Sequence, residues 1–178
     1  QSAELSPEKN IIEKLKAQVI GGWGSSIQRG SEAALLFTEM ISQREQTGRP
    51  MILMGDFNNT LQDGVLTHLL TNTLRFASAF DVNAYLEKYC LSDAWDLFQS
   101  TDNDTQHIER KPTHYYGATG SVLDYILLSS EFDANYQASL FEVSGYDTYD
   151  RHLINPIFER DGESTDHGVV LVTLSLRT

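Results

Sequence analysis

The stretch PMILMGDFNNT, residues 50–60, places a short apolar run directly before a Gly-Asp-Phe-Asn turn. The run from Met51 to Met54 is continuously apolar, which is typical of a short strand buried on both faces. Asp56 and Asn58 follow where that strand ends, and such side chains often cap their own turn. They also place a carboxylate and a carboxamide two residues apart on a rigid edge. The stretch therefore predicts either a structural turn or one side of a polar site.

Two helices are predicted upstream of this strand. Ser6-Pro7-Glu8 has the residues of a helix start, and Gly21-Gly22 predicts where that helix ends. A second helix is predicted over residues 31–46, with Gly48 and Pro50 as stop signals.

The rest of the chain reads as helical segments followed by strands. A helix is predicted near residues 63–71, and the region up to residue 98 reads as mostly helical. Residues 145–164 read as a long irregular loop, and loops of that length are often functional. Helices followed by strands favour the α/β class. The strands are predicted over residues 111–116, 122–129, 136–143 and 168–176.

The bulk composition narrows the classes of function. The 178 residues carry a net charge of −12, which argues against a protein that coats nucleic acid by charge alone. Acidic chains can still meet phosphates through a metal ion. No apolar stretch approaches the roughly 20 residues that cross a bilayer. The single cysteine, Cys90, excludes an internal disulfide.

Three short segments place polar side chains at the edge of an apolar strand: residues 55–58, 123–127 and 164–167. Taken singly, each has a structural explanation as a turn, a buried satisfied carboxylate or a solvated loop end. Open α/β sheets bind ligands just beyond strand ends, so the three segments together are predicted to converge on one pocket.

The ordered trio resembles the motifs of the endonuclease/exonuclease/phosphatase superfamily. These metal-dependent phosphoesterases include pancreatic-type deoxyribonuclease, apurinic endonucleases, neutral sphingomyelinases and inositol polyphosphate 5-phosphatases. The matching motifs are Gly-Asp-Phe-Asn at 55–58, Asp-Tyr-Ile-Leu at 124–127 and Thr-Asp-His at 165–167. Arg29 and the helix that follows it are also similar to the family. Thr165 stands where Ser is usual, and Val122 stands where many members carry Arg.

The resemblance implies a fold as well as a site. It implies an α/β protein that forms part of a four-layered α/β/β/α sandwich, with mixed, mostly antiparallel sheets and flanking helices. The family's earlier strands, one ending in Asn and one in a metal-binding Glu, are not recognisable ahead of Ser31. We therefore expect residues 1–178 to be a single partial domain, the C-terminal portion of the fold, whose partner is the absent N-terminal portion.

The implied chemistry is metal-dependent hydrolysis of phosphate esters. By resemblance, Asp166 lies at the metal, which is Mg²⁺ with Mn²⁺ or Ca²⁺ as alternatives. Asp56 activates the attacking water, and Asn58 positions that water and donates to a phosphate oxygen. Asp124 holds His167, whose imidazolium donates to the phosphoryl oxygen as charge builds.

Two further residues are candidates for substrate contact, and several substrates remain open. His114 and Arg151 are expected near the phosphate ester, each weighed against an ordinary surface position. The substrate is a nucleic acid, a lipid headgroup or an inositol phosphate, with a nuclease favoured over a phospholipase or an inositol phosphatase. The alternative is a catalytically incomplete fragment that serves as a folded or binding module. We expect these 178 residues alone to be inactive.

Overall fold

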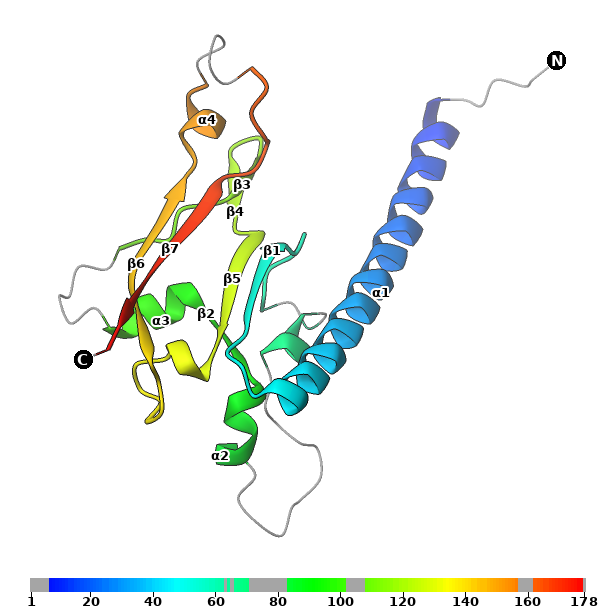
Figure 1. Ribbon diagram of the computed structural model, residues 1–178. Helices are drawn as coiled ribbons and strands as arrows, with labels where there is room; N and C mark the ends of the chain where they lie inside the picture. Colours follow the sequence, from blue (N-terminus) through cyan, green and yellow to red (C-terminus); the bar gives the residue numbers. More distant parts are fainter. Residues whose placement is uncertain are drawn as a thin grey trace.

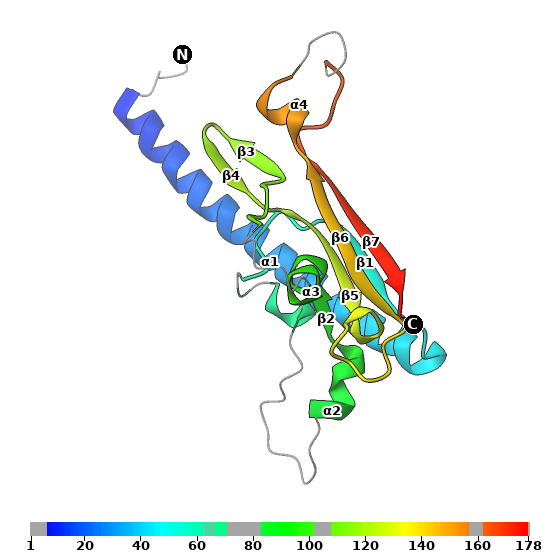
Figure 2. The same ribbon diagram turned by 90° about the vertical axis from the view of Figure 1, so that its left-hand side faces the viewer.

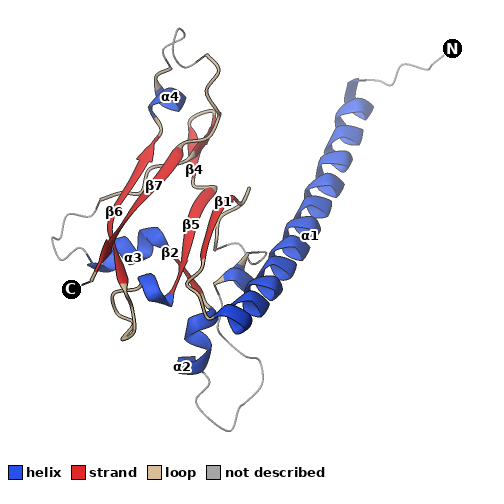
Figure 3. Cartoon of the chain, viewed as in Figure 1, coloured by secondary structure: helices blue, strands red, loops and turns tan. Residues whose placement is uncertain are grey.

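The computed structural model describes residues 7–62, 64, 66–70, 83–101, 108–156 and 162–177 (Figure 3). Its helices are α1 (Pro7–Thr47), α2 (Asn83–Leu86), α3 (Ala94–Thr101) and α4 (Arg151–Ile154), with short 3-10 turns at Thr67–Leu69, Glu87–Tyr89 and Ser130–Phe132. Its strands are β1 (Ile52–Asp56), β2 (Leu91–Asp93), β3 (His114–Tyr116), β4 (Thr119–Ser121), β5 (Asp124–Ser129), β6 (Phe141–Tyr149) and β7 (Val169–Leu176).

Helix α1 is one continuous helix where two were predicted. The prediction that Gly21-Gly22 ends a helix is wrong, because a helical Gly costs only about 1 kcal/mol relative to Ala and does not force a stop. The predicted stop at Gly48 is confirmed. Gly48 has φ 62°, and its N–H donates to the carbonyl oxygen of Arg44 at 2.8 Å, which is a left-handed helix cap.

The N-terminal part of α1 projects away from the rest of the described structure (Figure 1). No described element covers its apolar side chains, and Trp23 is 70% exposed. The exposed apolar side chains of this part are Ile11, Ile12, Leu15, Val19, Ile20, Trp23 and Ile27.

The central sheet has the strand order β1-β5-β2, with both pairings antiparallel. Strand β1 was predicted to be buried on both faces, and this is wrong. It lies at the edge of the described sheet, and Ile52 and Met54 are 46% and 63% exposed. Strand β2 lies within the region up to residue 98 that was predicted to be mostly helical. Its residues Leu91–Asp93 instead pair with β5, because tertiary pairing overrides a weak local preference.

Two antiparallel hairpins complete the described strands, β3-β4 and β6-β7. The strand predicted over residues 136–143 begins only at Phe141, because tight turns hold residues 133–139, and it runs to Tyr149. The predicted loop over residues 145–164 therefore begins with strand and the short helix α4. Gly145 and Asp147 have a low strand propensity, yet they lie in β6 because they pair with residues of β7. The predicted final strand is confirmed as β7.

The described layers run from α1 through the central sheet to the β6-β7 hairpin (Figures 1 and 2). Strand β5 contributes side chains to the core on both faces of the central sheet, because successive side chains of a strand point to opposite faces. Tyr125 and Leu127 pack toward α1, while Ile126 and Leu128 pack toward the hairpin and α3. This arrangement of helices and antiparallel sheets confirms the α/β class.

Two ion pairs tie these layers together. Arg44, at the end of α1, binds Glu131, and both side chains are largely buried. Arg110 lies 2.5 Å from Asp93 on β2, donates to the Tyr146 hydroxyl at 2.8 Å and stacks on the surrounding aromatic rings. Among the described helices, none is both long and apolar enough to cross a membrane.

Candidate active site

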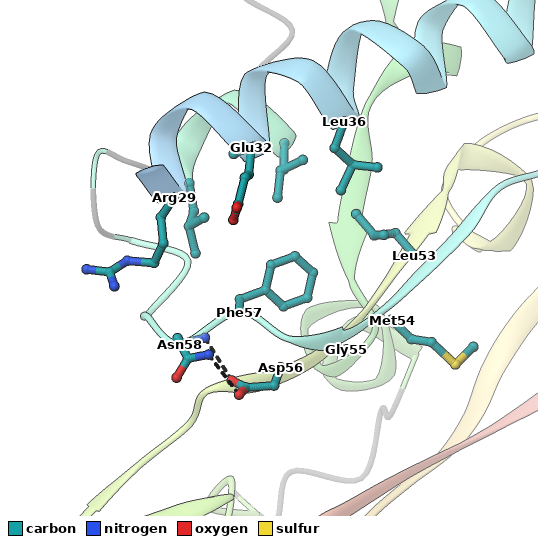
Figure 4. Close-up of a pocket in the computed structure, with 12 residues that line it drawn as sticks. Arg29, Glu32, Leu36, Leu53, Met54, Gly55, Asp56, Phe57 and Asn58 are labelled. Carbon is teal, nitrogen blue, oxygen red and sulfur yellow. Dashed lines mark hydrogen bonds between the residues drawn. The ribbon is translucent and has the colours of Figure 1, made fainter. Parts of the chain in front are cut away.

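The turn after β1 directs two polar side chains outward and one aromatic side chain inward. Asp56 accepts from the Asn58 backbone N–H at 2.8 Å and from the Asn58 side-chain amide at 2.9 Å (Figure 4). Asn58 adopts φ 50°, a left-handed conformation that Asn tolerates better than most residues. Phe57 packs edge-on against Tyr125, with ring centroids 5.8 Å apart. The aromatic anchor therefore fixes the carboxylate and the carboxamide on the rim.

The register of the central sheet brings a second carboxylate beside the first. Asp56 and Asp124 are directly opposite residues in the β1-β5 pairing, so their side chains point to the same face. Their side chains are 36% and 18% exposed, respectively. Both carboxylates thus stay open to a ligand.

His167 comes to this edge from the turn before β7. Its Nδ1–H donates to Asp124 Oδ2 at 2.8 Å, and its Nε2 lies 4.0 Å from Asp56 Oδ2. The Thr165 hydroxyl accepts from the His167 backbone N–H at 3.1 Å, and His152 Nε2 donates to the His167 carbonyl oxygen at 3.0 Å. The ring is therefore held by its backbone as well as by Asp124.

Thr113 is buried where the two sides of the site meet. Its Oγ1 accepts from the backbone N–H groups of Leu123 and Asp124 at 3.0 and 3.2 Å. Its carbonyl oxygen accepts from the Gly168 N–H at 2.6 Å. One residue thus connects the start of β5, which carries Asp124, to the segment that carries His167. Thr113 could not be identified from the sequence, because a single hydroxyl before a short strand gives no recognisable pattern.

Electrostatics favour the charged imidazole in this position. The hydrogen bond to Asp124 raises the pKa of His167 above its ordinary value of 6.5, partial burial opposes the rise, and the charges of Asp124, Asp56 and Asp166 add to it. The ring therefore stays protonated to a higher pH than an isolated histidine does. Such an imidazolium can donate to an anionic ligand from Nε2.

Two groups of side chains at this edge offer metal-ligand atoms within 4.8 Å of one another. One consists of Asp56, Asp124 and His167, and the other of His114, Asp166 and His167. The rings of His114 and His167 lie 5.1 Å apart between centroids, so β3 approaches the same point. Carboxylate oxygens are ligands that Mg²⁺ prefers, and this donor set fits a divalent cation.

Arg151 lies at the start of α4. Of the predicted site residues that the structure describes, it alone does not contact the other site residues. Its side chain is exposed, and its neighbour His152 makes the contact to His167 instead. The other candidates, Asp56, Asn58, Asp124, His114, Asp166 and His167, gather at one edge.

A cavity of about 280 Å³ adjoins this edge beneath α1 (Figure 4). Glu32 and Leu36 extend from the helix toward Phe57 and Leu53, and Asp56 and Asn58 form the rim nearest the histidine. Arg29 also lines the cavity, and its Nε is buried without a hydrogen-bond partner among the described residues. Arg29 stood out in the sequence only through the resemblance, and its place in the wall of this cavity was not predicted.

A family model described as "Endonuclease/Exonuclease/phosphatase family" matches residues 16–167. No curated protein and no solved structure matches the chain.

Proposed function

Because the chain belongs to the endonuclease/exonuclease/phosphatase family, whose members in general hydrolyse phosphate esters with a metal ion, we propose that its parent protein is a Mg²⁺-dependent phosphoesterase. The observation that carries the proposal is the contact of 2.8 Å between His167 Nδ1 and Asp124 Oδ2, with Asp56 and Asn58 beside it. A nuclease or phosphodiesterase is favoured, and a phospholipase or an inositol phosphatase of the same family is the alternative.

The cation would be held at the exposed Asp166, with Mn²⁺ or Ca²⁺ as alternatives to Mg²⁺. Asp166 is suited to this role because its carboxylate lies beside His114 and His167 and is open to solvent. When bound, the ion neutralises charge on the phosphate and on the leaving oxygen.

Asp56 accepts a proton from the attacking water. Each of its oxygens already accepts one hydrogen bond from Asn58, and a carboxylate has about four acceptor positions, so a water can still bind. The Asn58 amide has a second N–H, which can donate to a phosphate oxygen. The rigid turn keeps the acceptor and the donor in a fixed relation, which lowers the entropic cost of reaching the transition state.

His167 donates from Nε2 to the phosphoryl oxygen as negative charge develops. Asp124 fixes the ring orientation and favours the protonated form, which supports this role. Such a preorganised donor contributes more in the transition state than in the ground state.

His114 and Arg151 are proposed to contact the substrate. His114 lies beside His167 and can reach a phosphate oxygen or the group attached to it. Arg151 follows the buried Asp150 at the start of α4, next to His152, and would meet only a substrate that extends beyond His167.

We also propose that residues 1–178 are the C-terminal portion of a four-layered α/β/β/α sandwich. The open edge of β1 and its exposed Ile52 and Met54 support an additional strand beside it. An upstream segment that carries the metal-binding Glu would complete the site, so these residues assayed alone are expected to be inactive.

A substrate panel tests the proposal. Plasmid DNA, an abasic-site duplex, sphingomyelin and an inositol polyphosphate are each incubated with the parent protein and Mg²⁺, with EDTA as the metal-free control. Asp56→Asn should abolish most of the hydrolysis, whereas Asp147→Asn, an exposed carboxylate on β6, should not. Equal hydrolysis by wild type and Asp56→Asn would remove the proposed role of Asp56. Failure to hydrolyse any of the four substrates would favour the non-catalytic alternative.

A further inference from the structure

We propose that His114, Asp166 and His167 also bind a transition-metal ion, with Zn²⁺ as the reference ion, and that this ion blocks the hydrolytic site. The binding stands on the geometry of the three side chains alone. The blocking rests on the function proposed above.

The two histidines already have the spacing of a shared metal. Two imidazoles on one tetrahedral zinc have ring centroids about 5.2 Å apart, because each nitrogen binds at about 2.0–2.1 Å with its centroid about 1.2 Å behind it. The observed separation is 5.1 Å. Ligand atoms of the trio lie within 4.8 Å of one another, and the exposed side chain of Asp166 can close the remaining gap by a rotamer change.

The contact with Asp124 prepares His167 for metal binding. Metal-bound histidines usually donate their other ring N–H to a carboxylate, which fixes the ring and the tautomer. His167 already donates from Nδ1 to Asp124 Oδ2 at 2.8 Å, so Nε2 is the nitrogen left for a metal. A ligand nitrogen of His114 lies within 4.8 Å of the ligand atoms of His167 and Asp166.

The donor set selects the type of ion. Two imidazole nitrogens and one carboxylate suit Zn²⁺ and its neighbours in the first transition row, whereas Mg²⁺ prefers oxygen ligands and keeps several waters. The fourth position would hold a water. The same edge can therefore bind Mg²⁺ through oxygens and Zn²⁺ through nitrogens, but not both at Asp166.

Occupation by Zn²⁺ would remove two groups that the proposed reaction uses. A metal on His167 Nε2 takes the lone pair that carries the donated proton, and Asp166 is no longer available to Mg²⁺. Hydrolysis should therefore fall as Zn²⁺ is added at a fixed Mg²⁺ concentration, because imidazole nitrogens favour Zn²⁺ over Mg²⁺ at the shared site.

Isothermal titration calorimetry with ZnCl₂ tests the binding on the 178-residue chain without any substrate. The variants are His114→Asn and Asp166→Asn. Asp166→Asn changes an exposed side chain and should not impair folding. Asp147→Asn is the matched control, because this exposed carboxylate on β6 lies outside the trio and does not contact it among the described residues. Histidine NMR signals identify the ligands independently.

We expect one Zn²⁺ per chain, bound at least about tenfold more weakly in both trio variants and within about threefold of wild type in Asp147→Asn. Signals of His114 and His167 should shift on addition of Zn²⁺. Wild-type affinity in both trio variants, or an equal loss in Asp147→Asn, would overturn the site.

The parent protein then separates the two proposals. Zn²⁺ binding through the trio without any hydrolysis in the substrate panel would overturn the proposed function and leave the metal site standing. Hydrolysis that persists when the Zn²⁺ site is saturated would overturn the blocking alone.

Discussion

Replacing Thr113 by Val tests how the two sides of the site are held together. Val has nearly the shape of Thr but lacks Oγ1, the acceptor for the Leu123 and Asp124 N–H groups at 3.0 and 3.2 Å. The carbonyl of residue 113, which accepts from the Gly168 N–H, is unchanged. The substitution therefore removes one acceptor and leaves two backbone donors without their partner.

The structure sets the size of the effect. A buried donor left unsatisfied costs about 1–3 kcal/mol, and the two donors belong to half-buried residues, so the loss should be about 2–4 kcal/mol. Thr113→Ser keeps the hydroxyl and removes one buried methyl group, which should cost about 1 kcal/mol. The order wild type, Ser, Val is the specific expectation.

Equilibrium unfolding in urea measures these differences in the free energy of unfolding. If this free energy changes with urea concentration at the same slope in each variant, the unfolding transitions are comparable. In the same samples, the NMR titration of His167 should give a lower pKa for Thr113→Val, because Asp124 is no longer fixed, and a pKa near wild type for Thr113→Ser. If Val is as stable as Ser, or if the Val variant leaves the His167 titration unchanged, the hydroxyl does not position the pair.

Other substitutions test the charges. Asp124→Asn should lower the pKa of His167 toward 6.5, as measured by NMR. In wild type, the raised pKa stabilises the fold below about pH 6.5, and this stabilisation is lost as pH rises through the pKa of the folded state. The variant should therefore also lose this pH dependence of stability. Burial raises the pKa of Glu131, but hydrogen bonds from Arg44 and Ser129 lower it overall, below 4.5. The free energy of unfolding should therefore fall as pH drops below 4.5 and through the pKa of Glu131 in the folded state. Glu131→Gln should flatten that part of the plot of urea midpoint against pH. Arg110→Met leaves Asp93, 5% exposed, without its cation and should destabilise by about 3–5 kcal/mol in urea unfolding, with partial recovery when Asp93→Asn is added. An unchanged midpoint in the single Arg110 variant would show that the pair is not needed.

The strand-end motifs could be predicted from the sequence because their signals are local. An apolar run followed by Gly-Asp-Phe-Asn predicts a strand and a turn, and β1 ends at Asp56. The resemblance then placed Asp124 and His167 together, and the structure has them in contact.

The elements that could not be predicted depend on partners distant in sequence. Strand β2 is three residues long and exists through its pairing with β5, while β6 gains its second half from β7. Helix α1 continues through Gly21-Gly22 because a helical Gly costs only about 1 kcal/mol relative to Ala. A glycine pair in the sequence is therefore a weak signal for the end of a helix. Thr113 gains its importance from backbone groups ten and eleven residues away, at the start of β5.

The account as a whole depends on His167 as the donor to the phosphoryl oxygen. The direct measurement is kcat for Mg²⁺-dependent hydrolysis by the parent protein, on the substrate of the panel that it cleaves fastest, for wild type and His167→Ala. Removing such a donor should lower kcat by about 10²–10³-fold with little change in folding. A decrease of less than about tenfold would contradict the proposed catalytic role of the Asp124–His167 pair, since a preorganised transition-state donor contributes more than that.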